Sequence, residues 1–276
     1  MLDLIITADD FGISEGISRG ILASHERGIV TAASVMANGR ALRRVVGEAA
    51  DHPRLALGAH LVFVGEDPPL LTRREVPTLV DRSGALPASW RHLAARVLAG
   101  RVDPDDVRAE GRAQLDLLRH DLGLNLTHVN THQHVHLLPA VAHVVIDLTL
   151  DAGVGYVRVP STRSRSPRAS VIRRWSRRLG AAAGRAGLST NDAFAGLDEA
   201  GRLTTADVLG AVAGSGHVGV LEINCHPGLP TSQDRERYRW DYAWEREVRA
   251  LTDPGLLDAI RRGRARLARP GRDSRV

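Results

Sequence analysis

Four short apolar runs, far apart in the chain, each end in acids or histidines, and this repetition constrains the fold most. The segments that carry these ends are Ala8–Gly12, Gly58–His60, Thr127–His136 and Gly219–Gly228. Short apolar runs separated by helical patterns are typical of parallel strands, whose carboxyl ends meet at one edge of the sheet. The sequence therefore predicts a polar site assembled at that edge, which favours an enzyme over a binding scaffold.

Strand and helix patterns alternate along most of the chain. Apolar residues recur at helical spacing from Ile13 to Arg27, and Asp103 followed by Pro104 is typical of a helix start. We expect strands at 4–8, 31–36, 55–58, 156–159 and 218–225, another in the histidine-rich segment, and helices at 13–27, 41–50, 103–123, 141–150, 205–213, 241–251 and 254–264. Repeated strand-helix units in 276 residues without a clear linker predict an α/β fold, a distorted TIM-like (β/α) barrel that forms a single catalytic domain over residues 1–276.

Three segments fall outside this alternation. Residues 62–88 are rich in proline, glycine and charge, which predicts a long loop over one face. A second insertion covers residues 161–196, and residues 265–276 form a basic tail. Loops at the mouth of a barrel select the substrate, so these insertions carry specificity that the sequence does not reveal.

Composition excludes several classes of protein. The net charge is +5, but the basic residues are arginines, which indicates compositional bias, and 4% aromatic content leaves little for base stacking, so we expect no nucleic-acid partner. The single cysteine, Cys225, excludes an intrachain disulfide framework and fits a reducing compartment. Met1–Asp3 lacks the basic residues of a signal peptide and Leu4–Ala8 is too short for its apolar core, which favours a cytoplasmic protein.

Strand alternation sorts the polar residues into faces. His128, Asn130 and His132 share one face, and Glu222, Asn224 and His226 share another. We expect both polar stripes to face the barrel interior near its mouth. If the chain is helical from Val135 onward, His136 joins the face of His132; otherwise His134 and His136 lie in a loop.

The adjacent acids Asp9 and Asp10 have two interpretations. Neighbouring side chains on a strand point to opposite sides, so one carboxylate would hold a metal and the other would accept a proton from water. Alternatively, one of them caps the helix that starts near Ile13. The histidines elsewhere favour the metal site, and an Asp-His-His set suits zinc, nickel, cobalt or manganese better than magnesium. Arg158 and His226 are candidates for the oxyanion donor and the acid for the leaving group.

The motifs, taken in this order, resemble the YdjC-like carbohydrate deacetylases, which include chitooligosaccharide deacetylases and the deacetylases of hopanoid biosynthesis. The resemblance runs from about Ile5 to Arg266. It rests on the segments Ala8–Gly12, Gly58–Leu61, Thr127–His136 and Cys225–Gly228. It implies a distorted TIM-like barrel with the site logic of NodB-type deacetylases. It also implies one divalent metal ion, often magnesium.

The resemblance also implies roles for individual residues. The metal ligands would be Asp10, His60 and His132, with Asp9 as general base and His226 as general acid. Arg158 precedes Val159 and Pro160, as in an arginine-proline element of NodB-like enzymes. Asn130 stands where chitooligosaccharide members typically carry an aspartate, and the chain looks more like the hopanoid type.

The implied reaction removes the N-acetyl group of an N-acetylated amino sugar, such as an N-acetylglucosamine-containing oligosaccharide or glycolipid, and releases acetate. The alternatives are another metal-assisted hydrolase, such as a phosphoesterase, and a non-catalytic sugar-binding barrel. The stretch Arg163–Arg185 predicts an amphipathic helix, apolar at Val171, Ile172, Trp175 and Leu179 and basic elsewhere. It would either lie on an anionic membrane that presents a lipid-linked sugar, or cover the barrel in solvent. The sequence also allows the protein to form a homo-oligomer.

Overall fold

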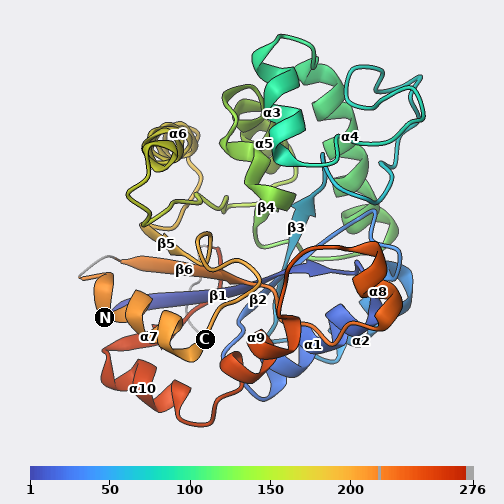
Figure 1. The fold of residues 1–276 in the computed structure, drawn as a ribbon. Helices are drawn as coiled ribbons and strands as arrows, with labels where there is room; N and C mark the ends of the chain where they lie inside the picture. Colours follow the sequence, from blue (N-terminus) through green and yellow to red (C-terminus); the bar gives the residue numbers. More distant parts are fainter. Residues whose placement is uncertain (217–218, 272–276) are drawn as a thin grey trace.

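The computed structural model describes residues 1–216 and 219–271, and its centre is a sheet of parallel strands (Figure 1). The strands lie in the order β4-β3-β2-β1-β6-β5, and β7 also pairs with β1. Their bounds are β1 (Leu2–Phe11), β2 (Ala32–Val35), β3 (Ala56–Leu61), β4 (Val129–Thr131), β5 (Ala193–Ala195), β6 (Val220–Cys225) and β7 (Ala265–Leu267). The residue that the sequence places at the start of the sixth strand, Val218, lies outside the described residues. Every pairing is parallel, as the strand-helix alternation predicts.

The sheet curls into a half-barrel, and one predicted strand is incomplete. Residues 156–159 make only isolated bridges, from Val157 to Val129 of β4 and from Tyr156 to Ser189. The backbone carbonyl of Tyr156 accepts from Val129 N–H at 3.0 Å, so this segment continues the curl from β4 toward β5 without forming a full ladder. Pro160 follows directly, and its missing N–H prevents further pairing. The α/β architecture is therefore consistent with a distorted barrel.

Helices connect the strands and pack around the sheet (Figure 1). Side-chain caps define several starts: Ser14 accepts from Ile17 N–H, Asp103 from Asp105 N–H, and Thr204 forms a reciprocal capping box with Asp207. The helices are α1 (Glu15–Glu26), α2 (Leu42–Ala50), α3 (Trp90–Leu98), α4 (Pro104–Asp116), α5 (Pro139–Asp151), α6 (Pro167–Arg185), α7 (Thr205–Gly214), α8 (Ser232–Arg237), α9 (Trp244–Leu251) and α10 (Leu256–Arg262).

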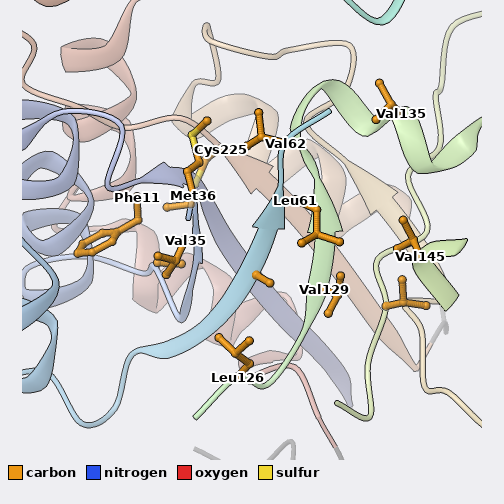
Figure 2. Packing of buried hydrophobic residues seen from close by; sticks show 14 of the residues in the cluster. Phe11, Val35, Met36, Leu61, Val62, Leu126, Val129, Val135, Val145 and Cys225 are labelled. Carbon is orange, nitrogen blue, oxygen red and sulfur yellow. The ribbon is translucent and has the colours of Figure 1, made fainter. Parts of the chain in front are cut away.

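The apolar core lies between the sheet and these helices. β1 is buried along nearly its whole length because it pairs with β2 on one side and β6 on the other. Figure 2 shows Phe11, Val35, Leu61, Val129 and Cys225 within this packing, and all five are inaccessible to solvent. Burying each such side chain stabilises the fold by about 1.5–3 kcal/mol. This packing holds in place the strands whose ends carry the polar residues.

Several elements were not expected from the sequence. The chain returns to helix at α3 soon after the loop of residues 62–88, β5 lies within the insertion of residues 161–196, and α8 precedes the last predicted helices. The tail predicted from residue 265 is wrong at its start, since Ala265–Leu267 forms β7 and pairs with β1. Short strands are missed because three residues show no periodicity. The last five residues of the predicted basic tail, 272–276, lie outside the described residues.

The predicted amphipathic helix is present as α6. Leu179 is buried, and Ile172 and Trp175 are partly buried against the core, whereas Val171 is exposed. Most of the apolar face thus packs on the protein itself, which is the covering role that the sequence left open. Within residues 1–216 and 219–271, no helix combines the length and apolarity needed to span a membrane.

Candidate metal centre

A register shift near the end of β1 changes the directions of the adjacent side chains of Asp9 and Asp10. The pairing of β1 with β2 shifts register between Ala8 and Phe11, and Asp10 has a positive φ of 72°. Side-chain alternation therefore stops at this bulge, and Asp9 and Asp10 do not point to opposite faces as the sequence suggested. The capping alternative is also wrong, because Ser14 caps α1.

Asp10, His60 and His132 form a buried cluster at the carboxyl ends of β1, β3 and β4. Asp10 Oδ1 lies 3.3 Å from His60 Nε2 and 3.2 Å from His132 Nδ1. The two imidazole nitrogens are 3.4 Å apart. Asp10 Oδ1 is buried and has no hydrogen-bond partner of acceptable geometry. Three donor atoms that converge on one point, one of them an unpartnered buried oxygen, can hold a metal ion.

His60 is oriented by Asn130, its cross-strand neighbour on β4. The amide of Asn130 lies 2.5 Å from His60 Nδ1. With the amide oxygen toward His60, Nδ1–H donates and Nε2 keeps its lone pair for the side of Asp10; the reversed amide would instead place its oxygen 2.9–3.0 Å from Arg158. Ligation by Nε2 requires the first orientation, because a metal-binding imidazole holds its proton on the other nitrogen.

Opposite charges hold the carboxyl group of Asp10 in its ionised form. Burial acts to raise the pKa of Asp10, but the adjacent His132 and His60 imidazoles hold that pKa well below its usual range. Burial acts to lower the pKa of His60. That pKa nevertheless rises, because the carboxylates of Asp9 and Asp10 lie beside the imidazole. The centre is therefore electrostatically suited to a carboxylate and two imidazoles that share one cation.

Asp9 is held by an arginine that comes from the far side of the sheet. Arg158 Nη1 and Nη2 donate to the two Asp9 oxygens at 2.6 and 2.9 Å, and Nε donates to Glu222 at 2.7 Å. Arg158 is fully buried. Burial would raise the pKa of Asp9, but the Arg158 guanidinium holds it well below its usual range. Asp9 is thus a buried, ionised carboxylate beside His60.

Glu222 extends this network into the barrel interior. It accepts from the hydroxyls of Thr7 and Tyr156, each at 2.9 Å, in addition to Arg158. The predicted inward stripe on β6 is therefore confirmed at Glu222. Arg158 donates from all three of its nitrogens to carboxylates, so the geometry favours a positioning role for it over direct donation to a substrate oxygen.

His226 ends β6 and lies close to the same carboxylates. Its backbone N–H donates to Glu247, its ring lies 4.9 Å from the Tyr242 ring, and its Nδ1 is buried without a hydrogen-bond partner. The charge of His226 is among the interactions that lower the pKa of Asp9, after burial and the larger effects of Arg158 and His60. His226 is therefore placed beside the centre, with one ring nitrogen free to meet a ligand.

The remaining histidines of the motif, His128, His134 and His136, do not join the cluster. His136 lies in a 3₁₀ turn (His132–Leu137), where its Nδ1 is 2.6 Å from Thr131 Oγ1 and its Nε2 is 3.0 Å from the Arg158 carbonyl. It does not share a ligand face with His132. His128 contacts Ser34 Oγ at 3.1 Å. Burial, reinforced by the charge of Arg158, lowers the pKa of His128 to about 3.

Comparison with known proteins agrees with this arrangement of strand ends. Residues 3–262 match the model of the YdjC-like protein family. The chain belongs to the YdjC-like family. A carbohydrate deacetylase from Homo sapiens is 33% identical over 292 aligned positions, covering 97% of this chain and 88% of the relative. A carbohydrate deacetylase from Brevibacillus brevis is 38% identical over 147 residues, a stretch of 53% of this chain and 55% of the relative.

A solved structure shows the same fold. A protein from Enterococcus faecalis V583 that is named for cellobiose-phosphate cleavage superposes with a TM-score of 0.78 at 25% identity, covering 97% of each chain. Both of the curated relatives named above are carbohydrate deacetylases.

This YdjC-like protein also has an aromatic wall beside the centre, which the sequence did not reveal. We define the wall as Tyr238, Trp240, Tyr242 and Trp244, which run from the end of α8 to the first residue of α9. The Trp240 ring lies 5.3 Å from the ring of His132, and Trp240 Nε1 donates to Glu66 at 2.9 Å. One signal was available: these residues are four of the chain's ten aromatic side chains, concentrated in seven positions. The contacts themselves join distant segments and have no local signature.

Proposed function

We propose that this protein is a metal-dependent hydrolase that removes the N-acetyl group from an N-acetylated amino sugar and releases acetate. One observation carries the proposal: a buried Asp10-His60-His132 cluster stands beside a second carboxylate, Asp9, that is held ionised. The ligand set uses the carboxylate of Asp10. The carboxylate of Asp9 is then available as a general base that takes a proton from water, as amide hydrolysis requires.

The residues would divide the work as follows. Asp10, His60 and His132 would hold one divalent ion, which when bound supplies a Lewis acid for the acetyl carbonyl and lowers the pKa of water. Asp9 would accept the proton of the attacking water, and Arg158 would hold Asp9 in place. His226, whose Nδ1 has no partner, would donate a proton to the departing amine. Because Asp9 and His226 come from opposite ends of the chain, we treat residues 1–276 as one catalytic unit.

The chemistry of the donors favours a particular class of ion. Two of the three donors are imidazole nitrogens and one is a carboxylate oxygen. Imidazole suits zinc and similar transition metals, whereas magnesium prefers oxygen ligands and water. We therefore propose zinc or a similar transition metal, in preference to the magnesium implied by the family resemblance.

The substrate class rests on the curated relatives, whose names specify carbohydrate deacetylation. An N-acetylglucosamine unit, free, oligomeric or lipid-linked, is our proposal for this chain. Contact of α6 with a membrane, a cytoplasmic location and a homo-oligomer stay predictions. Co-sedimentation with anionic vesicles at low salt tests membrane contact. Intact protein that stays in the supernatant would contradict it.

Acetate release from a panel of N-acetylglucosamine compounds tests the proposal. Protein loaded with zinc, cobalt, manganese or magnesium is compared with chelated protein and with Asp9→Asn. Asp147→Asn, an exposed acid on α5, serves as the control. We expect metal-dependent release that Asp9→Asn abolishes and Asp147→Asn retains. A tightly bound ion with no release from any acetamido sugar would contradict the proposal and favour a phosphoesterase or a sugar-binding protein.

A further inference from the structure

The aromatic wall is divided into anchors and presented faces. Tyr238 and Trp244 are buried, at 1% and 2% exposure, whereas Trp240 and Tyr242 are partly exposed. Adjacent rings are close, with centroids 5.2 Å apart for Tyr238 and Trp240 and 5.5 Å for Trp240 and Tyr242. The two buried rings therefore hold the two exposed ones in place.

The exposed rings are beside the groups that would do the chemistry. Trp240 is tilted over His132 at a centroid distance of 5.3 Å, and Tyr242 lies 4.9 Å from His226. One ring thus adjoins a candidate metal ligand and the other adjoins the candidate acid. A ligand whose reacting group sits between His132 and His226 would have its remaining atoms against these two rings.

The orientation of the wall is set by contacts from outside its own segment. Trp240 Nε1 donates to Glu66 Oε1 at 2.9 Å, and the Tyr238 hydroxyl donates to the buried Asp67 at 2.7 Å. A Cβ added at Gly201 would lie 2.1 Å from a carbon of the Tyr242 ring, so the backbone of Gly201 supports that ring closely. Glu66 and Asp67 belong to the loop of residues 62–88, which therefore joins the wall at the mouth of the barrel.

Trp240 and Tyr242 pack against the core but are not fully buried, and the indole of Trp240 is tied to Glu66. Part of each ring therefore faces solvent, where it offers a flat apolar surface. Pyranose rings have C–H faces and a rim of hydroxyls, and aromatic faces with polar groups at their edges complement that pattern. The protein has few aromatic residues, so their concentration next to the centre is informative.

We propose that Trp240 and Tyr242 form the platform on which the pyranose ring of the substrate lies while its acetamido group reaches the metal centre. Trp240 contributes the larger face, and Glu66 fixes its tilt. This inference rests on the proposed function for the identity of the sugar. It assigns ring recognition to the platform, and assigns metal binding to the cluster below it.

The test uses Trp240→Ala and Trp240→Phe in full-length, zinc-loaded protein. Trp175→Ala is the matched control, since Trp175 is likewise a partly buried tryptophan that packs against the core but lies on α6, outside the wall. An N-acetylglucosamine oligomer is the probe. Its dissociation constant is measured by calorimetry on the Asp9→Asn background, its kcat and KM are measured without that change, and zinc affinity is measured separately.

We expect Trp240→Ala to weaken sugar binding about tenfold or more, which corresponds to about 1.4 kcal/mol, and Trp240→Phe to weaken it less. KM should rise by a larger factor than kcat falls, and Trp175→Ala should match the parent. Unchanged sugar affinity in Trp240→Ala, or an equal loss in Trp175→Ala, would overturn the platform. Loss of zinc affinity in Trp240→Ala would also overturn it, since the ring would then only support His132.

The two proposals fail differently. If the parent protein binds the oligomer but releases no acetate, the deacetylase proposal is wrong, and the platform is still judged by the effect of Trp240→Ala on binding. If the parent releases acetate and Trp240→Ala binds the sugar as the parent does, the platform is wrong and the deacetylase stands. Circular dichroism of each variant separates either result from misfolding.

Discussion

The metal centre and the aromatic wall meet at His132 but are built in different ways. The centre takes its side chains from the ends of β1, β3 and β4, whose backbones are tied by parallel ladders. Three of the four wall residues belong to the irregular segment between α8 and α9, and Trp244 begins α9. The wall is tied mainly by side chains of the loop that carries Glu66 and Asp67. Strands hold reacting groups rigidly, and loops adapt to the shape of a ligand.

The centre and the wall also differ in the charges that they carry. Asp9 and Arg158 are fully or nearly fully buried, so their charges are satisfied by neighbouring protein groups: Arg158 lies between the carboxylates of Asp9 and Glu222. In the wall, the exposed Trp240 and Tyr242 carry no charge. Changes in the centre should therefore abolish chemistry, whereas changes in the wall should alter recognition and local stability. The following predictions test that division.

The largest effect is expected from loss of the carboxylate ligand. Asp10→Ala removes the oxygen that lies within 3.3 Å of both imidazoles. Because even outer-shell partners of a metal contribute about 10–100-fold in affinity, we expect zinc affinity to fall by more than about 100-fold. Competition with a chromogenic chelator measures this. Asp151→Asn, an exposed acid on α5, is the control; retained zinc affinity in Asp10→Ala would show that the ligand set is misassigned.

Asp9→Asn should separate chemistry from metal binding. Asparagine keeps an oxygen that can accept from Arg158 but cannot take a proton from water. We expect kcat for acetate release to fall by about 10²–10⁴ while zinc affinity stays within a few-fold of the parent. Calorimetry and an acetate assay measure the two quantities. A parallel loss of metal would place Asp9 among the ligands and contradict the division of roles.

Stability should depend on pH through the buried histidine at the start of the β4 motif. The pKa of His128 is about 3 when folded, because of burial and the charge of Arg158, against about 6.5 when unfolded. Between these values the unfolded chain binds a proton that the folded chain does not. The free energy of unfolding therefore falls by about 1.4 kcal/mol per pH unit from this residue as pH drops below about 6.5.

Urea denaturation of chelated protein between pH 4 and 7 measures that slope. His128→Gln should reduce it by close to one proton, whatever the other titrating groups contribute. The variant also loses the contact with Ser34, which should lower the free energy of unfolding by the same amount at every pH and leave the slope unchanged. Equal slopes for the variant and the parent would mean that His128 takes up a proton in the folded protein.

The smallest effect is expected at the base of the wall. Tyr238→Phe removes the hydroxyl that donates to buried Asp67, leaving that carboxylate with the Arg237 contact at 2.6 Å. We expect a loss of about 1–3 kcal/mol in the free energy of unfolding and a modest rise in KM. Chemical denaturation measures the first. Arg112→Met, which breaks an exposed ion pair, should stay within about 0.5 kcal/mol and serves as the comparison. An equal change in both variants would contradict the anchoring role of Tyr238.

Much of the centre could be predicted because its placement follows from local pattern. His60 comes at the end of an apolar run, and Asp10 and His132 do likewise. Parallel strands bring such ends to one edge, so three residues far apart in the chain were expected together, and the structure gathers them. The same local signals predicted β1, β2, β3 and β6 and most helices, with bounds that differ by a few residues.

The remaining features depend on contacts between distant segments. Arg158 and Asp9 are 149 positions apart, and Trp240 and Glu66 are 174 apart, so no periodicity links them. The positive φ of Asp10 likewise arises from a shift in the pairing of β1 with β2. Periodicity reports which face of an element is buried, but the partner of a buried charge or of a ring is chosen only when the folded sheet brings the two segments together. For this reason local pattern predicted which strand ends meet, and the family resemblance singled out Asp10, His60 and His132 as ligands. The support of Asp9 and the placing of the aromatic wall required the fold.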